Sequence, residues 1–367
     1  MRYVVIVFIL SAISLFSQQP NEIWNTHESR AGKTTYVIDD GDYFFAANDV
    51  NGVIRYKKNS QDFVEMFDMG GVQSPKINYL AKDSSGVIWA AGNKGLFRWD
   101  GKEWNYIDLS DKIENFIRKI DKIHIDKRGK IWMLGLSDEA HDQIGYYYND
   151  TTFWFDNNQV PERFLIEDVA FDSTGNFWAI ANTVRYISPK LIKISPLNHF
   201  IYLDSTNGLN PKDLGQYNSI CTDKAQNVWF AGKKSIYKIY PNENIERFKL
   251  FSKDSIGTED SLRYYSISIK AFGNSIYSFG DYGYSLWDGA KWDNYKIDSS
   301  YGKLIEVREY CDSNYVVLTN ANLYLLNKYT NTWSLFRIQS KFHFDYIKNM
   351  DYFFISKSSF LNLDKDK

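Results

Sequence analysis

Acidic side chains gather in two short segments, Asp39-Asp40-Gly41-Asp42 and Asp138-Glu139-Ala140-His141-Asp142. Carboxylate oxygens are the ligands that Ca²⁺ prefers, so either segment has the chemistry of a calcium site. Short acidic runs are also typical of solvated turns, because aspartate bonds its own backbone there. Since solvated turns are the commoner outcome, we predict no metal and no cofactor.

Other residues with catalytic chemistry are scattered. The five histidines, at positions 27, 124, 141, 199 and 343, lack the short spacing of zinc ligands. The sequence has no glycine-rich phosphate loop and no nucleophile elbow. Whether two carboxylates lie at the separation that glycoside cleavage requires is a spatial question, which the sequence leaves open. No catalytic residue is therefore predicted.

The remaining candidates are polar and aromatic residues in loops, where binding sites on rigid scaffolds usually lie. They are Asn93, Lys94, Asp138, His141, Asp142, Lys233, Lys234, Asp281 and Tyr282. Lysine and aspartate can bond sugar hydroxyls or the charges of a partner protein. Tyr282 can stack on a sugar ring or on a partner's side chain. Whether these residues meet depends on the elements that carry them.

A seven-residue pattern recurs along the chain and ends in tryptophan. It reads Asp-x-x-Gly-x-x-Trp in three copies: Asp83–Trp89, Asp126–Trp132 and Asp172–Trp178. A fourth copy, Asp223–Trp229, has Gln226 in place of the glycine. Degenerate copies place other residues at the tryptophan position: Phe45, Tyr277, Val317 and Phe354. The spacing of these anchor positions averages about 44 residues, close to the roughly 40–50 residues of a four-stranded propeller blade.

Each repeat predicts four short strands. In the second repeat they are Ile77–Lys82, Val87–Ala91, Gly95–Trp99 and Glu103–Asp108. The Asp-x-x-Gly segment joins the first two, because aspartate bonds the backbone of a turn and glycine tolerates the left-handed conformation. The tryptophan is predicted to fill the gap between adjacent sheets. A glycine three residues later is predicted to open the next hairpin, at Gly92, Gly135, Gly232 and Gly280.

We therefore predict an all-β fold, a single β-propeller of four-stranded blades. The last repeat lacks a fourth strand, because only Ser359–Leu363 has strand character after Phe354. Glu22–Glu28 resembles the fourth strands of other repeats and is predicted to pair with Ser359–Leu363. This pairing gives eight blades and leaves no open sheet edge. Seven blades are the alternative if one degenerate copy is not a full sheet.

In a propeller, the loops between second and third strands share one face with the loops between successive blades. The candidate residues lie in these loops, around the predicted channel mouth. Asn93-Lys94, Lys233-Lys234 and Asp281-Tyr282 occupy equivalent places and share no chemistry. A structural constraint would tend to repeat, so this divergence indicates an asymmetric binding site shared by several blades.

The segment Asp83–Trp99 reads Asp-x-x-Gly-x-Ile-Trp-Ala-Ala-Gly-x-x-Gly-Leu-Phe-Arg-Trp. It resembles the two-component-regulator propeller repeat, which is abundant in exported sensor regions of Bacteroidota. The likeness is strong in the second, third and fourth repeats and fair in the fifth. The resemblance implies a propeller, an exported protein and a general glycan- or protein-sensing role.

The N-terminus predicts the compartment. Arg2 precedes an apolar run from Tyr3 to Phe16, and Ser17–Pro20 is polar, as in a secretory signal peptide. The run is shorter than the about 20 residues that span a bilayer. We predict a signal peptide over residues 1–19 and a propeller domain over residues 20–367. The mature chain is then periplasmic or extracellular, with no membrane span.

Composition and charge exclude one class of partner. The 367 residues carry a formal net charge of −2, whereas nucleic-acid binding needs a concentrated basic face. Aromatic residues make up 17% of the chain and favour strands. Two cysteines, Cys221 and Cys311, are too few for a disulfide scaffold, and the repeats place them too far apart for a bridge.

The sequence predicts an exported, non-enzymatic module that binds a glycan or a protein partner. One alternative is a propeller enzyme acting on polysaccharide, a lyase or a glycosidase. Another is a sensor component that passes a signal to a separate membrane protein. Two or more carboxylates, or histidine with tyrosine or arginine, converging at one channel mouth would favour the enzyme.

Overall fold

The structure is a computed structural model. It describes residues 26–28, 34–50, 52–57, 62–109, 117–137, 142–155, 164–183, 189–203, 205–209, 219–232, 235–249, 266–280, 283–297, 299–302, 304–311, 314–319, 323–330, 332–335, 345–346, 352–356 and 359–362. Regular structure in these residues is β, apart from the short 3-10 helices η1 (Ser205–Asn207) and η3 (Ser299–Tyr301). The all-β prediction is confirmed. Among these residues, no helix has the length and apolar character needed to cross a membrane.

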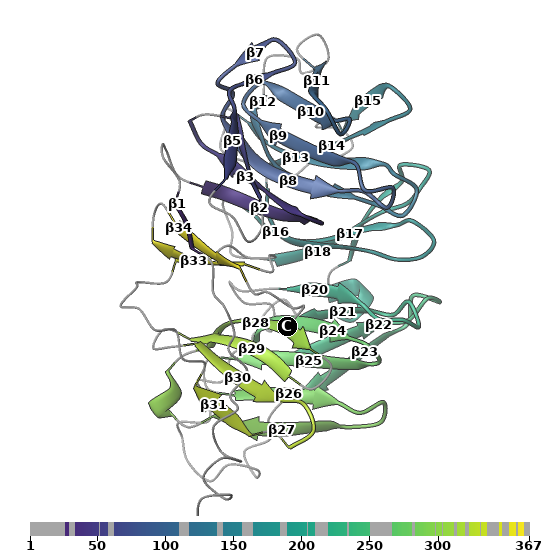
Figure 1. The fold of residues 1–367 in the computed structure, drawn as a ribbon. Coiled ribbons are helices and arrows are strands. Elements are labelled where there is room, and N and C mark those ends of the chain that lie inside the picture. Colours follow the sequence, from purple (N-terminus) through teal and green to yellow (C-terminus); the bar gives the residue numbers. More distant parts are fainter. Residues whose placement is uncertain are drawn as a thin grey trace, which may run out of the picture.

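The described strands form eight four-stranded antiparallel sheets and one two-stranded ribbon (Figure 1). The first sheet and the ribbon contain β2 (Thr34–Asp40), β3 (Tyr43–Asn48), β4 (Gly52–Lys57), β5 (Phe63–Met66), β6 (Asp68–Met69) and β7 (Val72–Gln73). The next two sheets contain β8 (Ile77–Lys82), β9 (Ile88–Gly92), β10 (Gly95–Trp99), β11 (Trp104–Asp108), β12 (Ile117–Ile125), β13 (Ile131–Ser137), β14 (Asp142–Tyr148) and β15 (Thr151–Trp154).

The following two sheets contain β16 (Phe164–Phe171), β17 (Phe177–Thr183), β18 (Pro189–Ile194), β19 (Phe200–Leu203), β20 (Ile220–Thr222), β21 (Val228–Ala231), β22 (Ser235–Ile239) and β23 (Ile245–Lys249). The last three sheets contain β24 (Ser266–Phe272), β25 (Ser275–Gly280), β26 (Gly283–Trp287), β27 (Trp292–Lys296), β28 (Leu304–Cys311), β29 (Asn314–Thr319), β30 (Leu323–Asn327), β31 (Trp333–Leu335), β32 (Asp345–Tyr346), β33 (Tyr352–Ser356), β34 (Ser359–Asn362) and β1 (Thr26–Glu28). In seven sheets, four consecutive strands lie side by side in chain order, which is consistent with a propeller.

The predicted anchor residues occupy the same register position in their sheets. Each anchor lies in the second strand of its sheet and faces an equivalent residue of the first strand. The pairs are Ile38 with Phe45, Ala81 with Trp89, His124 with Trp132, Ala170 with Trp178, Cys221 with Trp229, Lys270 with Tyr277 and Val307 with Val317. The degenerate copies are therefore structural equivalents of the tryptophan copies.

Consecutive sheets share hydrophobic clusters, and the anchors lie in them. Trp132 is fully buried among residues of its own sheet and of the β16–β19 sheet, against Phe177 at 4.6 Å between ring centroids. Trp229 is equally buried and lies in a cluster with residues of the β24–β27 sheet. The predicted role of the repeated tryptophans, filling the gap between adjacent sheets, is confirmed.

The aspartate of each tryptophan hairpin fixes both the turn and the indole. Asp172 Oδ1 accepts hydrogen bonds from the backbone N–H groups of Thr174 and Asn176, and its Oδ2 accepts one from Trp178 Nε1 at 2.9 Å. The other aspartate–indole distances are 3.1 Å (Asp83, Trp89), 3.5 Å (Asp126, Trp132) and 2.7 Å (Asp223, Trp229). Aspartate and tryptophan recur together because one positions the other.

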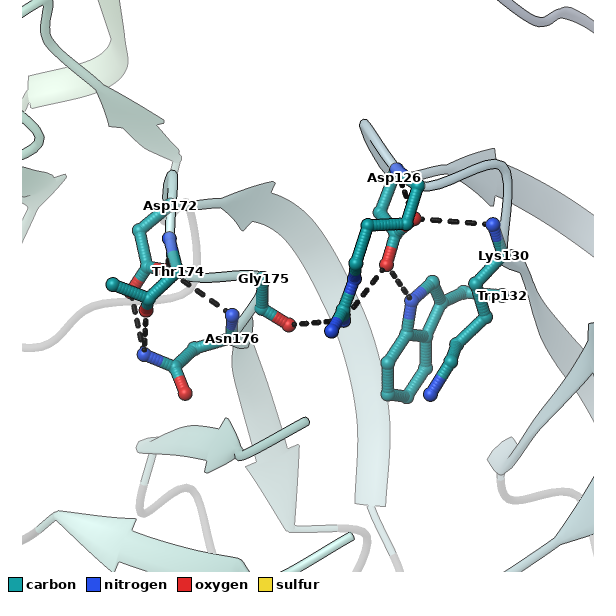
Figure 2. Close-up of polar contacts among 8 residues, drawn as sticks. Asp126, Lys130, Trp132, Asp172, Thr174, Gly175 and Asn176 are labelled. Atoms are coloured by element: carbon teal, nitrogen blue, oxygen red, sulfur yellow. Dashed lines mark hydrogen bonds and ion pairs between the residues drawn. The ribbon is translucent and has the colours of Figure 1, made fainter. Parts of the chain in front are cut away.

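Neighbouring hairpins are also joined. Figure 2 shows the Asp126 hairpin, with Lys130 and Trp132, beside the hairpin of Asp172 and Gly175. Arg128 Nη2 lies 3.2 Å from Asp126 Oδ2 and donates to the carbonyl of Gly175 at 3.0 Å. A Cβ on Gly175 would lie 2.5 Å from this guanidinium, and the φ of Gly175 is +82°. Only glycine fits this contact without displacing Arg128.

First strands bond to the first strand of the next sheet through polar side chains. Three such bonds run from Thr35 Oγ1 to Ile77 O at 2.8 Å, from Asn78 Nδ2 to Ile120 O at 2.9 Å, and from Ile220 N to Asp168 Oδ2 at 3.1 Å. The first strands also carry β-bulges, at 35, 78, 121 and 167 in the first four sheets. A bulge changes the direction of the side chains beside it, and it therefore affects which side chains these first strands, called the inner strands below, present to neighbouring sheets.

The N-terminal segment joins the C-terminal sheet. β1 pairs antiparallel with β34, and Thr26, His27 and Glu28 face Leu361, Phe360 and Ser359. The strand order is β1-β34-β33-β32, so β1 takes the place of a fourth strand. This pairing was expected of Glu22–Glu28; residues 22–25 of that segment, and the signal peptide, lie outside the described residues.

One predicted turn is wrong. Gly92 and Gly280 end their strands, as expected, and Gly232 follows β21. β13, however, continues through Gly135, which pairs with Gln143, and ends at Ser137. The longer ladder of β13 with β12 and β14 makes a glycine there an ordinary strand residue.

Candidate functional site

Two of the predicted channel-mouth residues, which are called rim residues below, lie in the turn between β9 and β10. Asn93 and Lys94 are both exposed. Asn93 bonds to the segment between sheets: its Oδ1 accepts from Lys76 N and its N–H donates to Lys76 O, both at 3.1 Å. The carbonyl of Lys94 accepts from the hydroxyl of Tyr106 at 2.7 Å. Asn93 therefore has a structural role, and Lys94 directs its ammonium into solvent from a fixed turn.

The other predicted rim residues are not brought together by the described structure. Asp142 was expected in a loop but is the first residue of β14, where it pairs with Leu136. The rest lie outside the described residues: Asp138, His141, Lys233, Lys234, Asp281 and Tyr282.

The acidic segment at the β2–β3 turn contributes an ion pair. Asp40 Oδ1 lies 2.8 Å from Lys82 Nζ, which links this hairpin to the next sheet. Among the described residues, no group of three or more His, Cys, Asp or Glu side chains could hold a metal ion.

A cavity that the sequence did not reveal, lined by both polar and apolar side chains, lies against the first strands of three consecutive sheets, β8, β12 and β16. Its volume is about 60 Å³. It is lined by Tyr79, Lys122, His124, Leu134, Ile166, Glu167, Asp168 and Val169. Tyr79, Lys122 and Asp168 occupy equivalent positions, each two residues before the partner of a tryptophan anchor. Each also follows a bulge residue, so the same local irregularity shapes this wall in all three sheets.

The cavity's carboxylates have different surroundings. Asp168 Oδ2 accepts from Ser219 Oγ at 2.8 Å and from Ile220 N at 3.1 Å, and Oδ1 accepts from Val169 N at 3.0 Å. Glu167 Oε1 accepts from Asn182 Nδ2 at 2.8 Å. Asp168 is thus held by three donors, whereas Glu167 is held at one oxygen.

His124 is the ionisable group most perturbed by its burial here. Burial lowers the pKa of His124 to about 4; nearby Asp168 opposes this effect and Lys122 adds to it. The ring lies 5.8 Å from the ring of Tyr79, and among the described residues none forms a hydrogen bond with it. His124 is therefore neutral near pH 7, with one nitrogen as donor and the other as acceptor.

Tyr79 and Cys221 are poorly suited to reaction. The Tyr79 hydroxyl bonds to the hydroxyl of Tyr36 at 2.9 Å. Cys221, in the register position of His124, is a free thiol, and burial raises its pKa, so it stays protonated.

A sequence signal for this cavity existed. Ten residues before three of the tryptophans, the chain carries Lys122 in β12, Asp168 in β16 and Ser219 directly before β20. Charged and hydroxyl side chains at one repeated position of a buried strand indicate a polar surface. The bulges that bring Glu167 to the same cavity also recur at the repeat spacing, but no single residue type marks them.

No protein-family model matches this chain, and no curated protein matches it. Solved structures are similar at low identity. The structure described as YCF48 bound to D1 peptide is 12% identical with a TM-score of 0.50, and the match covers 82% of this chain and 93% of that one. The computationally designed protein Ika8 is 9% identical with a TM-score of 0.53, over 92% of this chain and 98% of its own.

A third similar structure is the extracellular domain of the putative hybrid two-component system BT3049 from B. thetaiotaomicron. It is 12% identical, with a TM-score of 0.41 over 90% of this chain. This chain spans 62% of that domain's length. At these identities the likeness is one of fold. The chain has a propeller-like fold.

Proposed function

We propose that this chain is an exported, eight-bladed β-propeller of the two-component-regulator type that binds a glycan or a protein partner at one rim. The proposed rim residues are Lys94, Asp138, His141, Asp142, Lys233, Lys234, Asp281 and Tyr282, with Asn93 holding its loop.

The observation that carries this proposal is the contrast between repeated and divergent polar positions. The repeated carboxylates, such as Asp172, are used by the fold to hold their own turns and tryptophans. The turn of Lys94, at the opposite end of the strands, is exposed and joins the fully buried strand β9 to β10. A rigid scaffold with variable exposed turns is suited to binding.

The rim is tested with two matched lysines. Lys94 and Lys127 are both exposed turn residues, but they lie at opposite ends of their strands. A glycan array and cross-linking in the periplasmic fraction would first identify a ligand. Lys94→Ala and Tyr282→Ala should then weaken binding, Tyr282→Ala more strongly because aromatic anchors dominate interfaces. Lys127→Ala should bind like the parent. Loss of binding in Lys127→Ala alone would show that the opposite face is the site.

Closure of the ring is supported by the pairing of β1 with β34 and is tested by deletion. Removing residues 20–30 from the mature chain should expose the edge of β34 and lower the melting temperature of the whole domain. A peptide of residues 20–30 added in excess should restore part of that loss. Unchanged thermal stability in the deleted chain would contradict a closed ring.

An enzyme acting on polysaccharide is the second candidate, because histidine, tyrosine and two carboxylates line one cavity. Three observations favour binding instead: Asp168 is held by three donors, the Tyr79 hydroxyl is bonded to Tyr36, and about 60 Å³ cannot hold a sugar ring. Cleavage of a polysaccharide by the parent protein, lost in His124→Ala and Glu167→Gln, would establish the enzyme.

A further inference from the structure

The inner-strand cavity has a donor side and an acceptor side. β12 supplies Lys122 and His124, and β16 supplies Glu167 and Asp168. Its volume of about 60 Å³ is several times the minimum of about 10–15 Å³ that holds one water molecule. A ligand held here must therefore be small, and it meets charges of both signs.

The donor side is unpaired. Among the described residues, the ammonium of Lys122 forms neither an ion pair nor a hydrogen bond, although it lies close enough to His124 to affect its pKa. The neutral His124 ring offers an N–H with no acceptor in the described structure. These two groups suit a carboxylate, which accepts several charge-assisted hydrogen bonds.

On the acceptor side, one carboxylate oxygen of Glu167 lacks a donor among the described residues. Glu167 uses one oxygen to accept from the amide of Asn182, and the other oxygen of that carboxylate has no partner among the described residues. A carboxylate oxygen without a donor suits an ammonium group, which carries three N–H donors.

We propose that this cavity binds a small zwitterion, a free α-amino acid of the size of glycine or alanine. Its carboxylate faces Lys122 and His124, and its ammonium faces Glu167. A simple anion would leave Glu167 unpaired and be repelled by it, and a simple cation would do the same at Lys122. This site lies on the inner strands, away from the rim, so it goes beyond the proposed rim function and stands without it.

Calorimetric titration of the mature protein with glycine and L-alanine tests the ligand class. Acetate carries only the carboxylate, methylammonium only the ammonium, and glycine betaine both charges without N–H donors. We expect glycine to bind about tenfold or more tightly than each of these three, because each lacks one set of charge-assisted bonds. Acetate binding as tightly as glycine would overturn the zwitterion. So would the absence of glycine binding at concentrations up to about 100 mM, far above a useful affinity.

Variants locate the site. Lys122→Met and Glu167→Gln preserve side-chain length, and each should weaken glycine binding about tenfold or more. Lys119→Met is the matched control: Lys119 lies on the same strand, but it pairs with Asp121 at 2.7 Å and does not line the cavity. Thermal melting of each variant establishes that it is folded, and Glu167→Gln serves if Lys122→Met does not fold. Glycine affinity unchanged in a folded Glu167→Gln protein would show that glycine binds elsewhere and that the cavity holds water only.

Discussion

Two hairpins at equivalent places in their sheets are built differently. Between β16 and β17, a five-residue turn is held by the carboxylate of Asp172, which also accepts from Trp178. Between β24 and β25, the ladder continues to the pair of Phe272 and Ser275, and Gly273-Asn274 makes a two-residue turn. The second hairpin has no such carboxylate, and its anchor is Tyr277.

These two hairpins show that the anchor residue has two roles, packing between sheets and bonding to the carboxylate of the turn. Tyr277 packs against Phe272 and Tyr315, at 5.7 and 5.1 Å between ring centroids, and its aromatic ring joins two sheets. Trp178 fills an equivalent gap and also donates its indole N–H to Asp172. Packing requires a large ring, whereas the carboxylate turn requires tryptophan. The pattern Asp-x-x-Gly-x-x-Trp is therefore one unit.

Truncation of the anchor is expected to have the largest effect. Trp178→Ala should lower the free energy of unfolding by about 3–5 kcal/mol, because it leaves a cavity between two sheets and an aspartate without its partner. Chemical denaturation measures the change. Trp178→Phe keeps an aromatic ring but removes the indole N–H, and unchanged stability in this variant would mean that the indole bond contributes nothing.

Loss of the Asp172 carboxylate is expected to have the next largest effect on stability. Asp172→Asn should cost about 2–3 kcal/mol at pH 7, because an amide nitrogen replaces one acceptor and the charge is lost. Burial by itself would raise the pKa of Asp172, but hydrogen bonds from Thr174, Trp178 and Asn176 outweigh it, and the pKa is lower than the ordinary 3.8. The folded-state pKa is thus below the unfolded one, so the stabilisation is complete above about pH 4 and is lost as pH falls through the folded-state value.

Denaturation curves at several pH values check this. The difference between the parent and Asp172→Asn should shrink below about pH 4, where the aspartate of the parent becomes protonated. Asp42→Asn, in the exposed two-residue turn of the β2–β3 hairpin, is the control and should stay within about 0.5 kcal/mol. If the difference in free energy of unfolding between the parent and Asp172→Asn does not depend on pH, the destabilisation comes from the changed hydrogen-bond geometry and not from the lost charge.

Two turn glycines, Gly175 and Gly129, test the contact between the neighbouring hairpins. Gly175→Ala should cost about 2 kcal/mol, since it forces a side chain into the left-handed region and against Arg128. Gly129→Ala has a similar φ of +79° but no atom within 4 Å of the added Cβ, and it should cost about 1 kcal/mol. If both variants unfold at the same denaturant concentration, the contact between the two hairpins has no energetic weight.

The smallest expected effect is an increase in the free energy of unfolding. Gln226 stands where the other copies have glycine and has a φ of +67°. Gln226→Gly should raise the free energy of unfolding by about 0.5–1 kcal/mol, because relief of the left-handed strain exceeds the added entropy of the unfolded chain. A shift of the melting temperature measures it, and a destabilised variant would show that the side-chain bonds of Gln226 to the turn matter more than its backbone.

Much of the fold could be predicted because the repeat carries it. The strands Ile77–Lys82 and Gly95–Trp99 were predicted to the residue, and the degenerate anchors Phe45 and Tyr277 lie in the predicted register. The site could not be predicted in the same way. A cavity between three inner strands depends on bulges, which recur at the repeat spacing in different residue types and change the direction of residues such as Glu167.

The sheet that contains β1 and β34 has a consequence for how the molecule folds. Its two strands come from opposite ends of the described chain, so their pairing has a high entropy of loop closure and is expected to form last. Until then, β34 presents an unpaired edge to any strand in reach. In a concentrated solution, β1 of one copy can complete the sheet of another. Strand exchange between partly folded copies is thus the misassembly to which this topology is most exposed.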